Sequence, residues 1–415
     1  MLIAHNPVAN SGELLKRFAD ARTESDRLFA IIRPNALYER PIADRHRIVF
    51  YLGHLEAFEG NLFRETVGGL PSFHPEFDRL FAFGIDPVGT ALPSDRPEDW
   101  PKLEEIRDYN QRLRGQIDAR AVTDTQLLNV AIEHRLMHCE TLAYMLHRLP
   151  LEQKVRPSTA PLAFRNEPRW PSMVEIPTGS ATLGLSSSSG TFGWDNEFEA
   201  HSAVVPAFAI DKYKITNAQY LEFMQAAGYA NCRWWTDADW VWKTAHNITH
   251  PAFWRRSGDA WRYRAMFDEI PLPLDWPVYA SHAEASAYAR WAGKKLPTEA
   301  QWQRAAQGAQ PVGNADFKSW DPTPVSAFPE TRSDLGAVEM IGNGWEWTST
   351  VFAPFGGFEP FPFYPGYSAN FFDGKHYVMK GGSPRTAACM LRPSFRNWFQ
   401  PHYPYVYAGF RCVDS

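Results

Sequence analysis

Apolar residues recur at intervals of three and four positions through much of the first 150 residues, which is the spacing of a helix with one buried face. No strand-like alternation lies between these stretches, so we expect an antiparallel four-helix bundle. The four predicted helices cover residues 11–34, 44–65, 101–121 and 124–149. The connection over residues 68–100 is unusually long, and this makes it a candidate for function.

The pattern changes in the second part of the chain, where short apolar runs alternate with Gly, Pro and Asn turns. These runs predict strands at residues 173–177, 181–185, 203–210, 278–281, 376–382 and 408–413. Three short helices are predicted by capping boxes, in which a Ser or Thr is followed three residues later by Glu or Gln. The boxes pair Thr216 with Gln219, Ser281 with Glu284 and Thr298 with Gln301. The second helix should end at Gly293, which suits a left-handed position.

Both patterns together predict an α+β chain of two differently built domains. We expect the helical bundle over residues 1–155, a proline-rich linker over 156–172 and a second domain over 173–415. Tryptophan is distributed in the same way, since 15 of the 16 Trp lie at or after Trp170.

Composition narrows the classes of partner. Binding to nucleic acid or to an anionic membrane needs an excess of clustered Lys and Arg. The net charge of this chain is −5, so we expect neither as a partner. The first residues lack a secretory signal, and no uncharged apolar run reaches about 18 residues, so we expect a cytoplasmic protein. Four Cys without a CxxC spacing are too few for a disulfide scaffold or a structural zinc site. A metal, if present, needs other ligands.

Histidines supply such ligands. His134 and His138 are four residues apart on the fourth predicted helix, so both imidazoles project from one face and can bind one metal ion. His54 lies in the middle of the second predicted helix, on a stripe that also faces the bundle core. Glu140 could orient one of the imidazoles from behind. The spacing does not distinguish Fe, Zn and Ni.

The competing interpretation is a set of buried histidines that are hydrogen-bonded to acidic side chains and bind no metal. The acidic candidates are Glu56, Glu59 and Glu140.

Several long motifs occur in a fixed order along the chain. They are HRLMHCE (134–140), VEIPTGSATLG (174–184), FGWDNEFEAH (192–201), IDKYKITNAQY (210–220), HPAFWR (250–255), DWPVYASHAEASAYARWAGKKLPTEAQWQRAA (275–306), GNGWEWTST (342–350) and RPSFRNWFQPHYPYVYAGFRC (392–412). In these motifs the chain resembles the ergothioneine-type sulfoxide synthases. The resemblance implies a DinB-like four-helix bundle followed by a domain of the formylglycine-generating-enzyme type, which has a C-type-lectin-like fold.

The same resemblance implies a mononuclear non-haem Fe(II) held by His54, His134 and His138. Members of the family use O2 to join a sulfur donor to C2 of the imidazole of hercynine, with oxidation to a sulfoxide. An Asn-Trp pair that lines the hercynine pocket in the family matches Asn397 and Trp398. Aromatic faces suit the quaternary ammonium group of hercynine, because it has no N–H to donate.

Departures from the family motifs bear on the second substrate. Met137 stands where many relatives have Gln, and Phe399 stands where some have Asp. The loop with Phe83 has no Tyr over residues 82–101 and no Arg or Lys over 81–91. This loop resembles that of the selenoneine synthases, the branch of the family that couples a selenosugar to hercynine, and we expect a selenosugar donor. Met137, Phe399 and Phe83 are expected to contact substrate.

A phenol that could serve the reaction is then expected further along the chain, with Tyr403 and Tyr405 as catalytic candidates. Three alternatives stay open: a synthase that uses cysteine as its donor, a DinB-type thiol transferase that uses zinc, and a binding module without activity. A monomer or a homodimer is expected.

Overall fold

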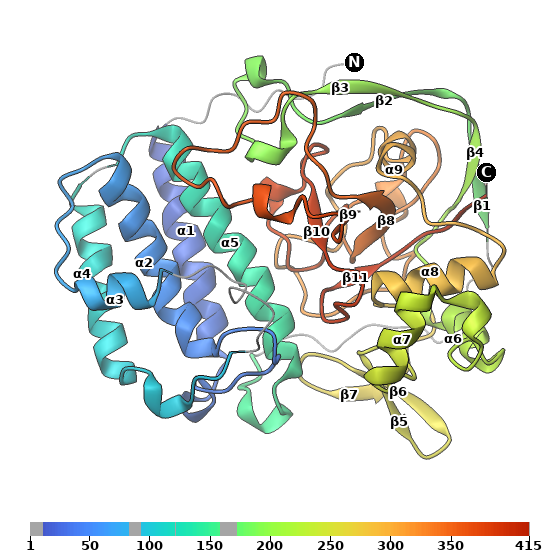
Figure 1. Cartoon of the computed structure of the whole chain (residues 1–415), viewed down its shortest axis with the longest axis horizontal. Coiled ribbons are helices and arrows are strands. Elements are labelled where there is room, and N and C mark those ends of the chain that lie inside the picture. Colours follow the sequence, from blue (N-terminus) through green and yellow to red (C-terminus); the bar gives the residue numbers. More distant parts are fainter. Residues whose placement is uncertain (1–10, 83–92, 121, 158–171, 415) are drawn as a thin grey trace. The chain divides into compact units, whose positions relative to one another are not determined.

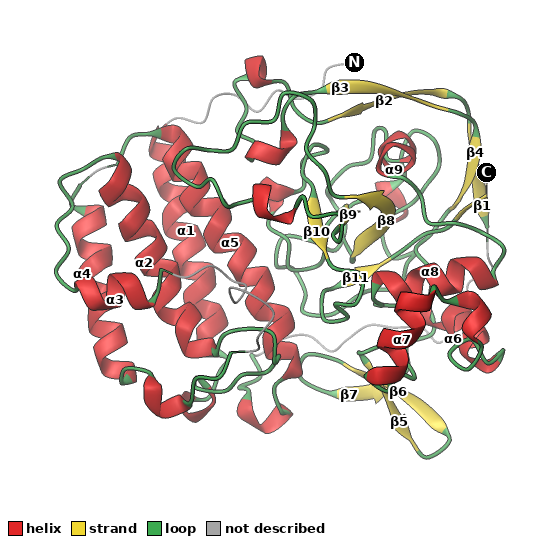
Figure 2. Cartoon of the chain, viewed as in Figure 1, coloured by secondary structure: helices red, strands yellow, loops and turns green. Residues whose placement is uncertain are grey.

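The computed structural model describes residues 11–82, 93–120, 122–157 and 172–414. The chain divides into two compact units, residues 1–159 and 160–415. Each unit has its own architecture, as Figures 1 and 2 show. The mixed helix and sheet class expected from the sequence is confirmed. Most of the predicted linker, residues 158–171, lies outside the described part of the chain.

Unit 1 is built from four long helices, at the places where the sequence predicts them (Figure 1). They are α1 (Ser11–Ala30), α2 (Ile48–Thr66), α4 (Leu103–Asp118) and α5 (Thr125–Arg148). Helix α1 packs against α5, and α2 packs against both α4 and α5. The carboxylate of Asp124 caps α5 by accepting from the main-chain N–H groups of Gln126 and Leu127.

A short helix that the sequence analysis did not predict lies in the long connection. It is α3 (Pro75–Leu80), with proline at its first position and a capping bond from the Phe77 N–H to His74 Nδ1. Helix α3 packs against α2. The start of this connection is therefore ordered against the bundle.

The described part of unit 2 has four small sheets with many loops (Figure 2). In the order of their pairing, the sheets are β1 (Met173–Ile176), β4 (Phe208–Asp211), β12 (Val413–Asp414); β10 (Asn397–Phe399), β9 (Tyr377–Lys380), β8 (Trp345–Val351), β11 (Ala408–Gly409); β2 (Gly179–Leu183), β3 (His201–Val205); and β5 (Trp254–Ser257), β6 (Ala260–Arg264), β7 (Glu269–Pro271). Its helices are α6 (Asn217–Gln225), α7 (Asp237–Ala245), α8 (His282–Trp291) and α9 (Glu299–Ala305).

All three predicted capping boxes are confirmed, at the N-termini of α6, α8 and α9. Gly293 follows α8 with a φ of 70°, as expected for a left-handed glycine at a helix end.

The strand predicted over residues 278–281 is wrong. The N–H groups of Val278 and Ala280 donate to two different segments, at the carbonyls of Ile215 and Ala408, and Ser281 then caps α8. Helix α7 and the strands β5, β6, β7, β8 and β10 are not among the elements predicted from the sequence.

Large aromatic side chains fill the core of unit 2. Among the described residues of this unit, four indoles are fully buried, those of Trp194, Trp254, Trp276 and Trp347. Trp347 Nε1 donates to the carbonyl of Ala280 at 2.9 Å, so a buried ring also satisfies a loop carbonyl. Across the described helices of both units, no stretch combines the length and the hydropathy that a bilayer-spanning segment requires.

Candidate metal centre

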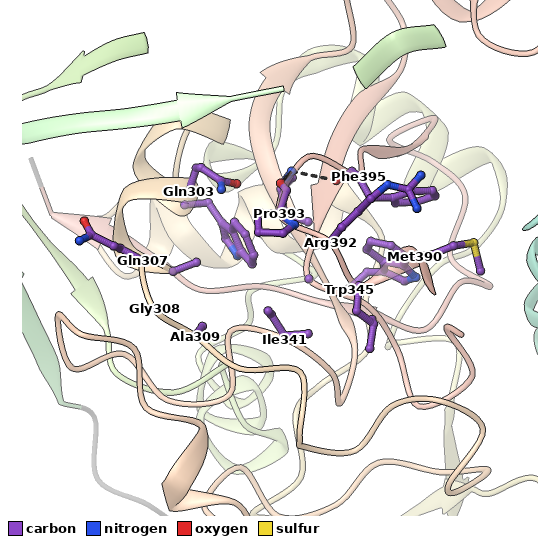
Figure 3. A pocket seen from close by; sticks show the side chains of 15 residues that line it. Gln303, Gln307, Gly308, Ala309, Ile341, Trp345, Met390, Arg392, Pro393 and Phe395 are labelled. Carbon is purple, nitrogen blue, oxygen red and sulfur yellow. Dashed lines mark hydrogen bonds between the residues drawn. The ribbon is translucent and has the colours of Figure 1, made fainter. Parts of the chain in front are cut away.

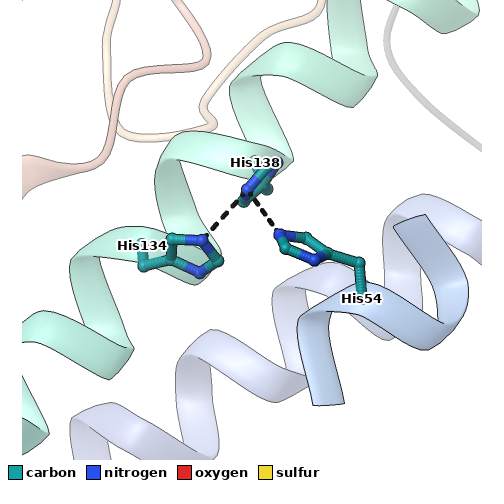
Figure 4. A group of neighbouring side chains, drawn as sticks. All are labelled: His54, His134 and His138. Atoms are coloured by element: carbon teal, nitrogen blue, oxygen red, sulfur yellow. Dashed lines mark hydrogen bonds between the residues drawn. The ribbon is translucent and has the colours of Figure 1, made fainter. Parts of the chain in front are cut away.

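Three histidines from two helices converge in the core of unit 1. His54 comes from α2, His134 and His138 come from α5, and all three are buried. The Nε2 atom of His138 lies 3.2 Å from Nε2 of His54 and 3.2 Å from Nε2 of His134. Figure 4 shows the three rings pointing toward one point. The structure thus brings together the three residues that the sequence analysis named as metal ligands.

The separations fit a shared metal ion. A metal about 2.0–2.1 Å from two imidazole nitrogens, at an angle between about 90° and 109°, holds them about 2.8–3.4 Å apart. The measured 3.2 Å lies in this range, and one possible ligand atom from each residue lies within 4.8 Å of the others. The residues present therefore fit a metal held by three neutral nitrogen ligands.

The protonation of these rings also suits metal binding. Burial lowers the pKa of His54 to about 4. Burial also lowers the pKa of His134 and of His138 well below the usual value, and neighbouring cationic groups act in the same direction. The Nδ1–H of His54 donates to the main-chain carbonyl of Phe81 at 2.7 Å, which leaves the lone pair on Nε2. Neutral rings with an available lone pair are the form that binds metal.

The competing interpretation placed Glu56 and Glu59 on the histidines, but both bind arginine. Arg135 Nε donates to Glu59 at 2.6 Å, and its guanidinium also lies 2.9 Å from Glu56. Burial alone would raise the pKa of Glu56, but Arg135 and Arg114 lower it to about 2. Both carboxylates are therefore already paired with arginine, and that interpretation is wrong for them.

Glu140 is also buried on α5. It lies two residues after His138, and residues at that spacing do not share a helix face. A positioning role for Glu140 stays a prediction.

Aromatic rings that the sequence analysis missed enclose the imidazoles. Phe58 stacks on His134 with ring centroids 3.4 Å apart, and Phe50 stacks on His54 at 4.9 Å. Tyr51 lies beside His138 at 5.8 Å. Phe50 and Phe58 stand four residues before and after His54, so helical spacing could have identified them. Aromatic rings therefore border all three imidazoles of the candidate metal centre.

The predicted hercynine contacts lie in unit 2, on β10. Trp398 is half-buried and stacks on Phe352, with centroids 4.2 Å apart and planes 7° apart. Tyr367 and Phe371 each lie 5.5 Å from the same indole. The side-chain oxygen of Asn397 accepts from the Trp398 N–H at 2.9 Å. The three rings around Trp398 could not be identified from the sequence, because they lie between 27 and 46 residues away along the chain.

The two tyrosine candidates belong to one aromatic stack with the third β10 residue. Phe399 and Tyr403 stack at 5.2 Å, and Tyr403 meets Tyr405 edge-on at 5.1 Å. All three are half-buried. The structure thus brings together Phe399, Tyr403 and Tyr405, which were predicted from one motif.

The other predicted contacts are not in this group. Met137 is half-buried on α5 of unit 1, next to His138. Phe83 lies outside the described residues.

A separate recess in unit 2 is lined by aromatic and aliphatic side chains and by two cations (Figure 3). Lys380 Nζ donates to the carbonyls of Pro393 and Phe395 at 2.7 and 2.8 Å. Arg392 Nε donates to Glu197 at 2.8 Å. Because both cations are already paired, the recess is a poor site for an anionic ligand.

Comparison with known proteins identifies the family. Residues 159–415 match the sulfatase-modifying factor enzyme 1-like domain. A hercynine oxygenase of Mycobacterium tuberculosis is 34% identical over 331 residues, which cover 74% of this chain and 77% of that protein. The chain belongs to the hercynine oxygenase family. It is therefore an enzyme of the oxidoreductase type.

Two other known proteins are less similar to this chain. Ergothioneine biosynthesis protein 1 of Neurospora crassa is 29% identical, and the match covers 91% of this chain but only 55% of that protein. PvdO from Pseudomonas aeruginosa, a solved structure, matches at 19% identity and a TM-score of 0.39, and the match covers 62% of this chain and 98% of PvdO. The expected relation to ergothioneine-type enzymes is confirmed at the level of the family. The relatives' names give no support to the selenium branch.

Proposed function

We propose that the chain is an O2-dependent, non-haem Fe(II) enzyme that joins cysteine to C2 of the hercynine imidazole and yields a sulfoxide. The observation that carries this proposal is the buried set of three neutral imidazoles, His54, His134 and His138. Three neutral nitrogen ligands leave the charge of a divalent metal uncompensated and leave coordination positions open, which favours an anionic thiolate. The names of the relatives support hercynine as the acceptor.

The proposed reaction balances without an external reductant. The C–H bond at C2 of hercynine and the S–H bond of cysteine break, while a C–S bond and an S–O bond form. The second oxygen atom of O2 leaves as water. The organic substrates lose four electrons and O2 gains four. Iron, when bound, would supply the redox chemistry that lets O2 react.

Unit 2 is proposed to hold hercynine through β10. Asn397 and Trp398 would bind its trimethylammonium group, with the indole as the aromatic face. One face of that indole is covered by Phe352, so the cation would meet the other. Tyr403 or Tyr405 would exchange a proton at its phenolic oxygen with the reacting groups.

The remaining expected contacts concern the donor. Met137, Phe399 and Phe83 are proposed to contact it, and unit 1 is proposed to be a DinB-like bundle. A selenosugar is the second candidate donor, because residues 81–91 offer no Arg or Lys for the carboxylate of an amino acid. The relatives' names favour sulfur, so cysteine is the primary proposal.

A donor competition tests the proposal. The chain is first loaded with Fe(II) in the absence of oxygen. It is then mixed with O2, hercynine and the two competing donors, cysteine and a selenosugar, which are at equal concentration. We expect the cysteine sulfoxide by mass spectrometry, with one O2 consumed per product. His134→Ala should abolish turnover, whereas His246→Ala, at an exposed position after α7, should retain it.

Each alternative predicts a different result. A faster C–Se product would overturn the sulfur assignment in favour of the selenosugar. Oxygen-independent thiol transfer with bound zinc would instead identify a thiol transferase. Tight hercynine binding that His134→Ala leaves intact, without turnover under any condition, would identify a binding module.

A further inference from the structure

His54 differs from the other two proposed ligands in how it is supported. His134 and His138 lie four residues apart on α5, so the geometry of one helix sets their spacing. His54 is supplied by a different helix, α2, and its ring must be aimed at them separately. A contact that fixes the rotation of the His54 ring therefore decides whether three nitrogens or two converge.

That contact is made by the main chain of Phe81, directly after α3. Its carbonyl accepts the Nδ1–H of His54 at 2.7 Å, on the side of the ring opposite to Nε2. The carbonyl fixes the tautomer, since it can only accept, and it also limits rotation of the ring. The position of this carbonyl depends on where the rest of Phe81 is held.

The side chain of Phe81 is held against a glycine of α2. Gly53 immediately precedes His54, and a Cβ built on it would lie 2.6 Å from three atoms of the Phe81 ring. That distance is shorter than real Cβ atoms show, so the ring occupies the space that a side chain at position 53 would need. Glycine is a poor helix former. Its presence inside α2 is explained by this close approach.

Other aromatic rings also pack against Phe81. Phe81 is fully buried, and its ring meets Phe77 at 5.5 Å and Trp100 at 6.2 Å. The hydroxyl of Tyr109 on α4 donates to Asp78 on α3 at 2.6 Å. Helix α3 is thus tied to α4 while Phe81 rests on α2.

We propose that Gly53 and Phe81 form a positioning pair for His54. The ring of Phe81 seats on Gly53, and this seat sets the position of the carbonyl that orients the His54 imidazole. The inference rests on the metal site of the proposed function and adds to it two residues that do not touch the metal. Outer hydrogen-bond partners of this kind typically change metal affinity by about 10–100-fold.

Gly53→Ala tests the pair, and α2 offers a matched control. Gly60 lies seven residues further along, about 10 Å away on the same helix face. A Cβ there would lie 2.8 Å from the side chain of Leu113, so Gly60→Ala also adds a methyl group against a packed neighbour. Both variants gain helix propensity, but only Gly53→Ala displaces Phe81. Phe81→Leu, which keeps the carbonyl and removes the ring, is the second variant.

Affinity of the full chain for Co2+ is measured by competition with a chromophoric chelator, together with the visible absorption of the bound ion and thermal melting. We expect Gly53→Ala and Phe81→Leu to weaken Co2+ binding about 10–100-fold and to alter the absorption bands, and Gly60→Ala to stay within about twofold of the unaltered chain. The absorption bands report ligand geometry, which a general loss of stability would not change.

Equal Co2+ affinities and bands in Gly53→Ala and Gly60→Ala, or native bands in Phe81→Leu, would overturn the positioning pair. Failure of the unaltered chain to bind Co2+ would instead overturn the metal site on which the proposed function rests. The pair would be supported by weaker Co2+ binding and altered bands in Gly53→Ala and Phe81→Leu but not in Gly60→Ala.

Discussion

Glu339 in unit 2 should make the stability of this chain decrease as pH rises from about 4.5 to 7. Its carboxyl group is buried, with only 1% of the residue exposed. Asn343 donates to Oε2 at 3.0 Å, while Oε1 has no hydrogen-bond partner among the described residues. Burial raises the pKa of Glu339 from 4.5 to about 7, although Lys214 and Arg411 oppose the shift.

The sign of the effect follows from linkage. The folded state binds the proton of Glu339 more tightly than the unfolded state, so folding is favoured when the group is protonated. A difference of 2.5 pKa units, from 4.5 to about 7, corresponds to about 3 kcal/mol of unfolding free energy. About 2.5 kcal/mol of this is lost between pH 5 and pH 8.

Glu339→Gln removes the ionisation and keeps nearly the same shape. We expect the variant to gain about 2.5 kcal/mol relative to the unaltered chain as pH is raised from 5 to 8, or roughly 5–10 °C in melting temperature. Urea unfolding followed by tryptophan fluorescence measures this, because 15 of the 16 Trp lie in unit 2 with Glu339. Glu330→Gln, at an exposed position of the same unit, controls for the loss of charge. A difference between Glu339→Gln and the unaltered chain that stays constant or shrinks with pH would refute the reasoning.

Two further predictions concern the candidate sites. Arg135→Met leaves Glu56 and Glu59 buried without the guanidinium that they share, so it should lower the unfolding free energy by about 3–5 kcal/mol. Urea denaturation followed by circular dichroism measures this change, and a loss below about 1 kcal/mol would contradict the pairing. Trp398→Ala should weaken hercynine binding about 5–30-fold and Trp398→Phe less, as measured by calorimetry, because cation–π contacts contribute about 1–2 kcal/mol. Equal affinities for the two variants would count against an aromatic contact.

Features encoded by neighbouring residues could be predicted from the sequence. The capping boxes of α6, α8 and α9 each depend on two side chains three residues apart, and all three form as expected. Helix α7 was missed for a related reason. Its cap is Thr236, but the residue three positions later is Asp239 rather than Glu or Gln, and the Thr236 side chain still accepts from the Asp239 N–H at 3.2 Å.

Strands in unit 2 were harder to predict because their pairing is not local. The strand β10 has only three residues, and it forms because Asn397, Trp398 and Phe399 pair with β9 about 20 residues earlier in the chain. The hairpin of β5 and β6 contains four arginines, so it lacks the apolar alternation by which strands were recognised.

In the candidate metal centre, too, local features could be predicted and non-local ones could not. The spacing of His134 and His138 on one helix indicated a shared ligand face, and the stripe of α2 that faces the core indicated His54. Phe81 could not be predicted as the support of His54, because its contact with Gly53 depends on how α3 docks on α2.

The uneven distribution of tryptophan has a physical cause that also bears on ligand recognition. Unit 1 buries long helices whose backbone groups bond within each helix, so its core needs few side-chain donors. Unit 2 has short strands and many loops, and the carbonyls of its loops need hydrogen-bond donors. An indole both fills space and donates a hydrogen bond. Trp235 Nε1 donates to the Gly228 carbonyl, and Trp347 Nε1 donates to the Ala280 carbonyl. A core of this kind leaves aromatic faces at its edge, as at half-buried Trp398. Such faces attract a cation that cannot donate a hydrogen bond, and this is the contact that we propose for the quaternary ammonium of hercynine at Trp398.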